Sequence, residues 1–116
     1  MLLKIDSFQF GELRIEGERY TKDVIIFPNR VEANWWRREG HKLALDDLDN
    51  VVAERPSKLL VGTGVHGVLK VPRFLIKYLR GLGIETTVAP TKEICQLHNR
   101  LVDTNENTIT ALHLTC

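Results

Sequence analysis

Three glycines that follow an apolar run have the spacing most suggestive of chemistry in this sequence. Gly62, Gly64 and Gly67 lie in the stretch KLLVGTGVHG, residues 58–67, with the G-x-G-x-x-G pattern of the dinucleotide-binding fingerprint. In that fingerprint the glycines let the backbone approach a pyrophosphate, which amides at the start of the next helix then bind. The stretch is therefore either a cofactor loop or a tight turn with the same spacing.

Two features around the glycines argue against a dinucleotide. Residues 68–71, VLKV, separate Gly67 from Pro72, so the next helix starts too late for its amides to meet a pyrophosphate. The fingerprint also needs an acid about 20 residues further on to bind the ribose, whereas the tip of the next strand, residues 86–91, reads TTVAPT. We expect no nicotinamide or flavin dinucleotide, and no other cofactor.

A small anion is a more general candidate ligand for the same loop. Two adjacent parallel strands are predicted to end at Gly62 and near Ala89, and open α/β sheets bind ligands beyond the carboxyl ends of their strands. Threonine hydroxyls and the free amides of a helix start would suit an anion there. The alternative is that the glycines only turn a tight corner over a neighbouring strand. The candidate anion or ligand residues are Gly62, Thr63, Gly64, Gly67 and Thr91.

No set of residues in the sequence has the spacing of a catalytic or metal site. His66 has no serine, cysteine or carboxylate nearby at catalytic spacing. The other histidines and the two cysteines form no ligand or redox pattern: His41, His98, His113, Cys95 and Cys116. We predict no metal, name no catalytic residue, and favour a protein that is not an enzyme.

The second unusual stretch is WWRREGHK, residues 35–42. On a strand Trp35 and Trp36 would point to opposite faces, so that one fills the core and the other is left for a partner. Arg37 and Arg38 add positive charge. Trp36, Arg37 and Arg38 are therefore candidates for contact with a protein partner or a second copy of the chain, and a solvated basic turn beside a packed tryptophan is the alternative.

The elements that position these residues are predicted as strands in the first half of the chain. FGELRIEGERY, residues 10–20, alternates apolar and charged residues around Gly17, as in a hairpin. VIIF, residues 24–27, is apolar throughout and predicts a strand covered on both faces. VEANW, residues 31–35, resumes the alternation of a strand.

Helices alternate with strands in the second half. A helix is predicted from a cap at Asp46 to Arg55, and a third helix from a cap at Thr91. The second, PRFLIKYLRGL, has Pro72 in its first turn and Gly83 after its end. The strands KLLVG and IETTV flank the second helix and form a parallel unit with it. The last strand, NTITALHLTC, is apolar on both faces and should be central.

Composition indicates a single α/β domain, residues 1–116, and excludes several classes of function. The formal net charge is +1 and the charges are interspersed, so nucleic-acid binding has little support. No apolar run approaches the roughly 20 residues of a membrane span, and no signal-peptide pattern opens the chain. We expect a cytoplasmic protein without membrane insertion.

Several stretches together resemble, in order and spacing, one family of small α/β domains of unknown biochemical function. They are FGELRIEGERY, WWRREGH, LLVGTGVHG, PTKEIC, HNRL and the terminal strand. The family includes a mitochondrial assembly factor for respiratory complex I, an adipogenesis-associated protein and many bacterial and archaeal hypothetical proteins. The chain departs from it at DTNENT, residues 103–108, where many members carry a charged Glu-Gly-Arg-like turn, and Cys95 stands where a small residue is usual.

The resemblance implies a three-layer fold with N-terminal hairpin strands and a mixed sheet whose last strand runs antiparallel to its neighbours. It implies no catalytic residues, and it places the family's pocket at the candidate ligand residues given above. We expect a binding or assembly module with a small polar pocket at the glycine-rich loop. The alternative is a small-molecule or anion binder, or an enzyme, acting at residues 62–67.

Overall fold

The computed structural model describes residues 3–104 and 107–116. The chain starts with a three-stranded antiparallel sheet made of β1 (Ile5–Gln9), β2 (Glu12–Ile15) and β3 (Glu18–Tyr20). Gly11 and Gly17 turn the chain between these strands with φ of +73° and +83°, a conformation that glycine adopts without a steric penalty. The predicted hairpin is confirmed, and its apolar alternation buries one face of the small sheet.

A five-stranded sheet forms the centre of the molecule, in the order β5–β4–β8–β6–β7. Its strands are β4 (Val24–Phe27), β5 (Arg30–Glu32), β6 (Lys58–Gly62), β7 (Glu85–Ala89) and β8 (Thr108–Leu112). β6 pairs in parallel with both β7 and β8, whereas β4 is antiparallel to β5 and β8. The predicted α/β class, with a mixed sheet, is confirmed.

The direction expected for the last strand needs a correction. β8 is antiparallel to β4, as the family resemblance implied, but parallel to β6. The reason is its connection: a helix leads from β7 back to β8, and a helical crossover returns the chain in the same direction. The carboxyl ends of three parallel strands therefore meet at one edge of the sheet.

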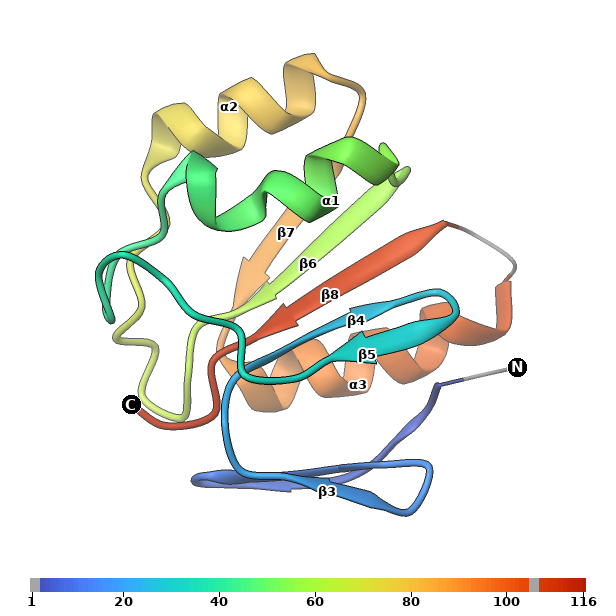
Figure 1. The fold of residues 1–116 in the computed structure, drawn as a ribbon. Helices are drawn as coiled ribbons and strands as arrows, with labels where there is room; N and C mark the ends of the chain where they lie inside the picture. The colour runs from blue at the N-terminus through green and yellow to red at the C-terminus, as the bar shows by residue number, and fades with distance from the viewer. Residues whose placement is uncertain (1–2, 105–106) are drawn as a thin grey trace.

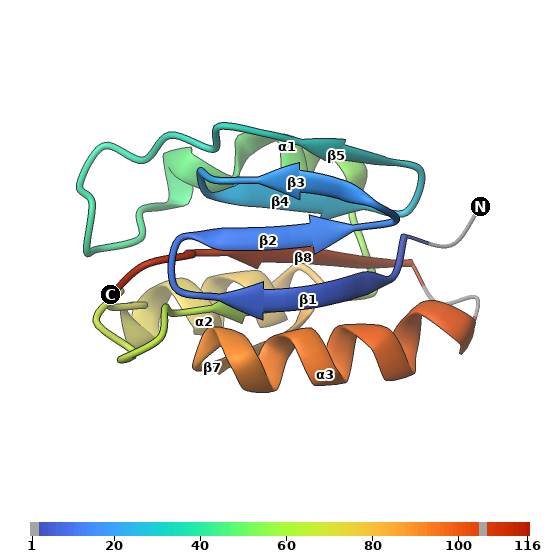
Figure 2. The same cartoon turned by 90° about the horizontal axis from the view of Figure 1, so that it is seen from below.

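Helices cover both faces of the central sheet. On one face lie a short 3-10 helix, η1 (Leu45–Leu48), the helix α1 (Asp49–Glu54) and α2 (Arg73–Gly81). On the other lie α3 (Thr91–Leu101), which a 3-10 turn, η2 (Val102–Thr104), extends, and the small N-terminal sheet (Figures 1 and 2). The result is three layers, with the small sheet and α3 sharing the third.

Two hydrophobic cores separate these layers. β4 and β8 contribute alternate residues to each, which explains why both strands carry apolar residues on both faces. The core under α1 and α2 includes Ile25, Phe27, Leu48, Val51, Leu75, Leu79, Ile109 and Ala111. The core under α3 and the small sheet includes Leu13, Ile15, Val24, Ile26, Ile94, Leu112 and Leu114. The predicted double-sided cover of β4 and β8 is confirmed.

Two predicted boundaries were wrong. The strand expected through Trp35 ends at Glu32, because Asn34 adopts a left-handed conformation with φ of +59°. Asp46 does not cap the first helix; instead the carboxylate of Asp47 accepts a hydrogen bond from the amide of Ala44 at 2.9 Å. The unusual DTNENT turn includes residues 105–106, which lie outside the described residues. No helix of the described ranges is long and apolar enough to span a bilayer.

Candidate functional site

The glycine loop, residues 62–67, leaves β6 where the three parallel strands end together. Gly62 is in register with Ala89 of β7 and Leu112 of β8. A side chain at residue 62 would meet the Leu112 Cδ2 and the Thr91 Oγ1 at 2.8 Å each. The loop and the start of α3 are thus brought together, as the sequence predicted, and they are in close contact.

The hydroxyl of Thr91 joins the start of α3 to the glycine loop and to the segment after β8. It accepts a hydrogen bond from the Gly64 amide at 2.8 Å and donates one to the carbonyl of His113 at 2.7 Å. Thr91 is fully buried. The expectation that Thr91 caps its helix was wrong, because Pro90 holds the cap position and these two contacts occupy the hydroxyl.

Amides in and directly after the glycine loop bind residues 115 and 116. The Val65 amide donates to the carbonyl of Thr115 at 2.7 Å. The amides of His66 and Val68 both donate to the carbonyl oxygen of Cys116, at 3.0 and 3.1 Å. Three backbone donors of the kind expected to bind an anion therefore hold main-chain oxygens.

The backbone conformation explains why residues 64 and 67 are glycines. Gly64 has φ of +104°, and a Cβ on it would overlap the main chain of Cys116, lying 2.7 Å from its carbonyl oxygen. Gly67 has φ of +68°, which favours glycine. Thr63 is buried, and its backbone carbonyl accepts a hydrogen bond from the Leu69 amide at 3.1 Å, which closes the loop.

A buried polar network that the sequence did not reveal lies beside this segment. The carboxylate of Asp23 contacts the Arg37 Nη1 at 2.8 Å and the His113 Nδ1 at 2.9 Å, and accepts from the Leu114 amide at 2.8 Å. Arg37 also donates to the Gly40 carbonyl at 2.9 Å and is only 8% exposed. Arg37 thus points inward, and of the candidate interaction residues only Trp36 and Arg38 lie on the surface.

The charge state of Asp23 follows from this network. Burial alone would raise the pKa of Asp23, but the hydrogen bonds from His113, the Leu114 amide and Arg37 outweigh it and hold the pKa below its ordinary value. Asp23 is ionised at neutral pH and compensates the buried guanidinium. The network fixes the segment after β5 to the segment after β8.

The same network brings a hydroxyl next to an imidazole. The Thr115 Oγ1 lies 3.4 Å from the His113 Nε2, so carboxylate, imidazole and hydroxyl follow one another as in nucleophilic catalysis. The distance is long for a hydrogen bond, and the nearby loop amides, which would have to stabilise an oxyanion, hold the carbonyls of residues 115 and 116. The arrangement therefore anchors residues 113–116.

The two adjacent tryptophans point in different directions. Trp35 is partly buried against the core under α1, and its indole N–H donates to the carbonyl of Asp47 at 3.0 Å. Trp36 is 77% exposed, the largest exposed fraction among the large hydrophobic side chains of the described residues. An exposed indole beside a packed one is the arrangement that the sequence predicted for a strand, although residues 35–36 are irregular here.

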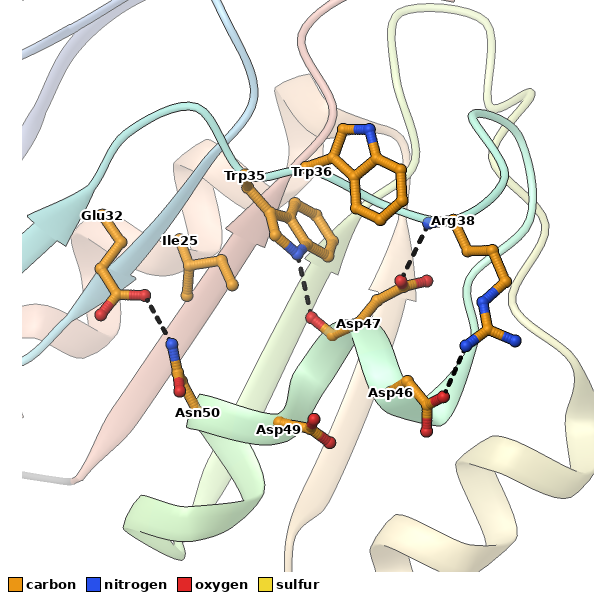
Figure 3. Close-up of a pocket in the computed structure, with 9 residues that line it drawn as sticks. All are labelled: Ile25, Glu32, Trp35, Trp36, Arg38, Asp46, Asp47, Asp49 and Asn50. Atoms are coloured by element: carbon orange, nitrogen blue, oxygen red, sulfur yellow. Dashed lines mark hydrogen bonds and ion pairs between the residues drawn. The ribbon is translucent and has the colours of Figure 1, made fainter.

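Trp36 borders two hollows in the surface. The first, of about 350 Å³, lies between the tryptophans and the start of α1, and we call it the acidic hollow. Figure 3 shows its lining: Ile25, Glu32, Trp35, Trp36, Arg38, Asp46, Asp47, Asp49 and Asn50. The second, of about 450 Å³, is lined by Thr21, Lys22, Asp23, Asn34, Trp35, Trp36 and Thr115. The exposed indole is thus a ridge between two concave surfaces.

The positions of the histidine, cysteine and acidic side chains decide whether a metal site can form. Within residues 3–104 and 107–116, no group of three or more histidine, cysteine, aspartate or glutamate side chains is placed to hold a metal ion. Cys95 is buried on the inner face of α3, and burial raises the pKa of its thiol to about 12. That thiol is protonated at neutral pH and is a poor nucleophile there.

The fold defines a class: small three-layer α/β domains with a mixed central sheet and a three-stranded antiparallel sheet packed beside one helix. Within that class the chain belongs to the family described as protein of unknown function DUF498/DUF598, whose model matches residues 5–113.

Solved structures support this assignment. A conserved hypothetical protein from Pyrococcus horikoshii is 30% identical, with 98% of this chain and 100% of that chain covered and a TM-score of 0.83. An outer membrane protein from Bartonella henselae is 21% identical (99% and 97% covered, TM-score 0.83). A Mth938-like domain from Bordetella pertussis is 14% identical (97% and 85%, TM-score 0.69). The last two show likeness of fold alone.

Proposed function

We propose that the protein is a non-enzymatic binding module that docks a protein partner through the surface around Trp36. The observation that carries this proposal is the exposed indole between two hollows. Burying a large apolar side chain contributes about 1.5–3 kcal/mol, so leaving it in water forgoes that gain until a partner covers it. Tryptophan is also enriched among the residues that dominate binding energy at interfaces.

The backbone that carries Trp36 is fixed on both sides, which favours binding. The Trp35 amide donates to the carbonyl of Asp23 at 2.8 Å, and the Arg38 amide donates to the carboxylate of Asp47 at 3.1 Å. Arg37, between them, is anchored in the buried network. A preorganised segment loses little conformational freedom when a partner binds.

The sequence resemblance supports the same class of function. The resembled family includes a mitochondrial assembly factor for respiratory complex I, and an assembly factor acts by binding other proteins. The matched family and the solved relatives are described only as of unknown function or by fold or location, so they assign no reaction.

Site-specific photocrosslinking tests the proposal. A benzoylphenylalanine is placed at residue 36 in one variant and at residue 74 in another, because Phe74 is 73% exposed on α2 and serves as the matched control. Expression in the cells that make the protein should give one discrete crosslinked product from position 36 and none from position 74. Equal products from both positions, or none from position 36, would contradict the proposal.

A second candidate function is a small-anion or small-molecule site, or an enzyme site, at the glycine loop. The observation in its favour is that the amides of residues 65, 66 and 68 converge on oxygen atoms. An anion there would have to displace the carbonyls of residues 115 and 116. Titration with inorganic phosphate, followed by the amide NMR signals of these three residues, tests it; unchanged signals would rule the anion out.

A further inference from the structure

The start of α1 concentrates negative charge on the surface beside Trp36. The sequence DDLD, residues 46–49, runs through η1 into α1, with Leu48 buried in the core and the three carboxylates at the surface. Glu32 of β5 adds a fourth carboxylate to the lining of the acidic hollow, and Arg38 is its one basic residue. Four carboxylates and one guanidinium give the hollow a formal charge of −3, although the whole chain carries +1.

Two of these carboxylates are compensated by ion pairs and two are not. Glu32 pairs with Arg30 at 3.3 Å, and Asp46 pairs with Arg38 at 2.9 Å. Asp47 accepts only backbone amides, those of Arg38 and Ala44. Asp49 has no hydrogen bond or ion pair among the described residues, and part of its charge offsets the positive end of α1.

The aromatic wall of the hollow suits a cation as well. In Figure 3 the Trp36 ring lies on one side of the hollow and the three aspartates lie on the other. An indole face is the best aromatic partner for an ammonium or guanidinium group. Arg37 does not reach the hollow, since its guanidinium stacks on Trp35, 4.7 Å from a ring centroid, and contacts Asp23 at 2.8 Å.

From these features, and resting on the proposed function, we propose that the acidic hollow binds a basic segment of a partner protein. One lysine or arginine side chain of that segment lies between the Trp36 indole and the carboxylates of Asp47 and Asp49. The hollow, of about 350 Å³, has room for one such side chain together with the backbone that carries it. Charge complementarity selects this partner over an acidic one.

A peptide titration of the full chain, labelled with 15N, tests the proposal. The probe is hexa-arginine, and hexaglutamate is the control peptide. The indole N–H signal of Trp36, which a Trp36→Phe variant identifies, should move on addition of hexa-arginine and not on addition of hexaglutamate. The shift should be lost near 1 M salt, where the Debye length falls to about 3 Å.

Charge-removing variants locate the binding surface. Asp49→Asn should weaken hexa-arginine binding by about two- to fivefold, the range for one exposed ion pair. Trp36→Ala should weaken it by a similar factor through the lost cation–π contact. Glu93→Gln is the matched control, because Glu93 is exposed on α3, across the sheet, and has no hydrogen bond or ion pair among the described residues.

An unmoved Trp36 signal with hexa-arginine would overturn the proposal, as would equal weakening by Glu93→Gln and Asp49→Asn. Failure here is separable from failure of the docking function. A crosslink from position 36 combined with full-strength hexa-arginine binding by Asp49→Asn would leave the docking surface standing and refute the basic partner. Loss of the crosslink would refute the docking surface itself.

Discussion

The hydroxyl oxygen of Thr91 lies 2.8 Å from the amide nitrogen of Gly64 and joins the start of α3 to the glycine loop. The same oxygen donates its proton to the carbonyl of His113, so one buried side chain connects the loop, the helix and the end of β8. The space that a cofactor fingerprint would offer to a phosphate is filled by the protein's own atoms. The G-x-G spacing serves close packing at the ends of three parallel strands.

Removing this hydroxyl should destabilise the fold. Thr91→Val keeps the shape of the side chain but leaves a buried amide and a buried carbonyl without their partner, which costs about 1–3 kcal/mol. Thr108→Val is the matched control, because the Thr108 hydroxyl is buried without a hydrogen-bond partner. Urea unfolding should show a loss of stability for Thr91→Val and no loss, or a small gain, for Thr108→Val. Equal losses would refute the role given to Thr91.

A side chain at residue 64 should displace residues 115–116. Gly64→Ala places a Cβ against Cys116 at a backbone φ of +104°, and a non-glycine residue in such a conformation costs on the order of 1–3 kcal/mol. The control is Gly81→Ala, in the last turn of α2 with open space around it, where alanine should stabilise the helix by about 0.5–1 kcal/mol. Opposite shifts of Tm are expected.

Thiol reactivity gives the Gly64→Ala variant a second readout. Cys95 is silent at neutral pH because burial raises its pKa to about 12, so a thiol reagent reports on Cys116. Displacing residues 115–116 from the loop amides should speed the reaction of Cys116 relative to wild type, whereas Gly81→Ala should leave it unchanged. An unchanged rate in Gly64→Ala would mean that residues 115–116 keep their place.

The helices and strands could be predicted from the sequence because the patterns that indicate them are local. The continuous apolar run of β4 and the apolar residues on both faces of β8 indicate cover on both sides. Pro72 and Gly83 mark the two ends of α2. The irregular segment after Glu32 was not predictable, because its course depends on Asn34 in a left-handed conformation and on contacts far away in the chain.

In the candidate site, too, the local features were predictable and the contacts between distant residues were not. Pairing of strand ends correctly predicted that the glycine loop meets Thr91, but no local pattern shows that residues 115 and 116 fill the loop. Arg37, interpreted as a surface charge, turns inward because its partners Asp23 and His113 lie 14 and 76 residues away in the sequence. The sequence shows only an isolated Asp23 before a buried strand and His113 directly after another, and neither indicates its partner.

The buried imidazole of His98 should couple the stability of the protein to pH. His98 of α3 is buried, and its Nε2 donates to the Leu3 carbonyl at 2.8 Å while its Nδ1 accepts from the Thr110 hydroxyl of β8 at 2.8 Å. Burial lowers the pKa of His98 below its ordinary 6.5, and the hydrogen bond to Leu3 offsets only part of this effect. The neutral ring is therefore the native form.

The sign of the effect follows from which state binds the proton first. The unfolded chain protonates His98 near pH 6.5, whereas the native protein does so only at lower pH. The contribution of His98 to stability is complete above pH 6.5 and declines as the pH falls toward the native pKa, by at most about 1.4 kcal/mol per pH unit.

Urea unfolding at several pH values measures how the free energy of unfolding changes with pH. The pH range, from about 7.5 to 5, spans the ordinary histidine pKa. His98→Gln, whose amide can still donate to the Leu3 carbonyl, should show a shallower decline than wild type. His66→Gln is the control, because His66 is exposed in the glycine loop, and it should keep the wild-type slope. If His98→Gln and wild type decline in parallel, the buried imidazole is not the group that couples folding to pH.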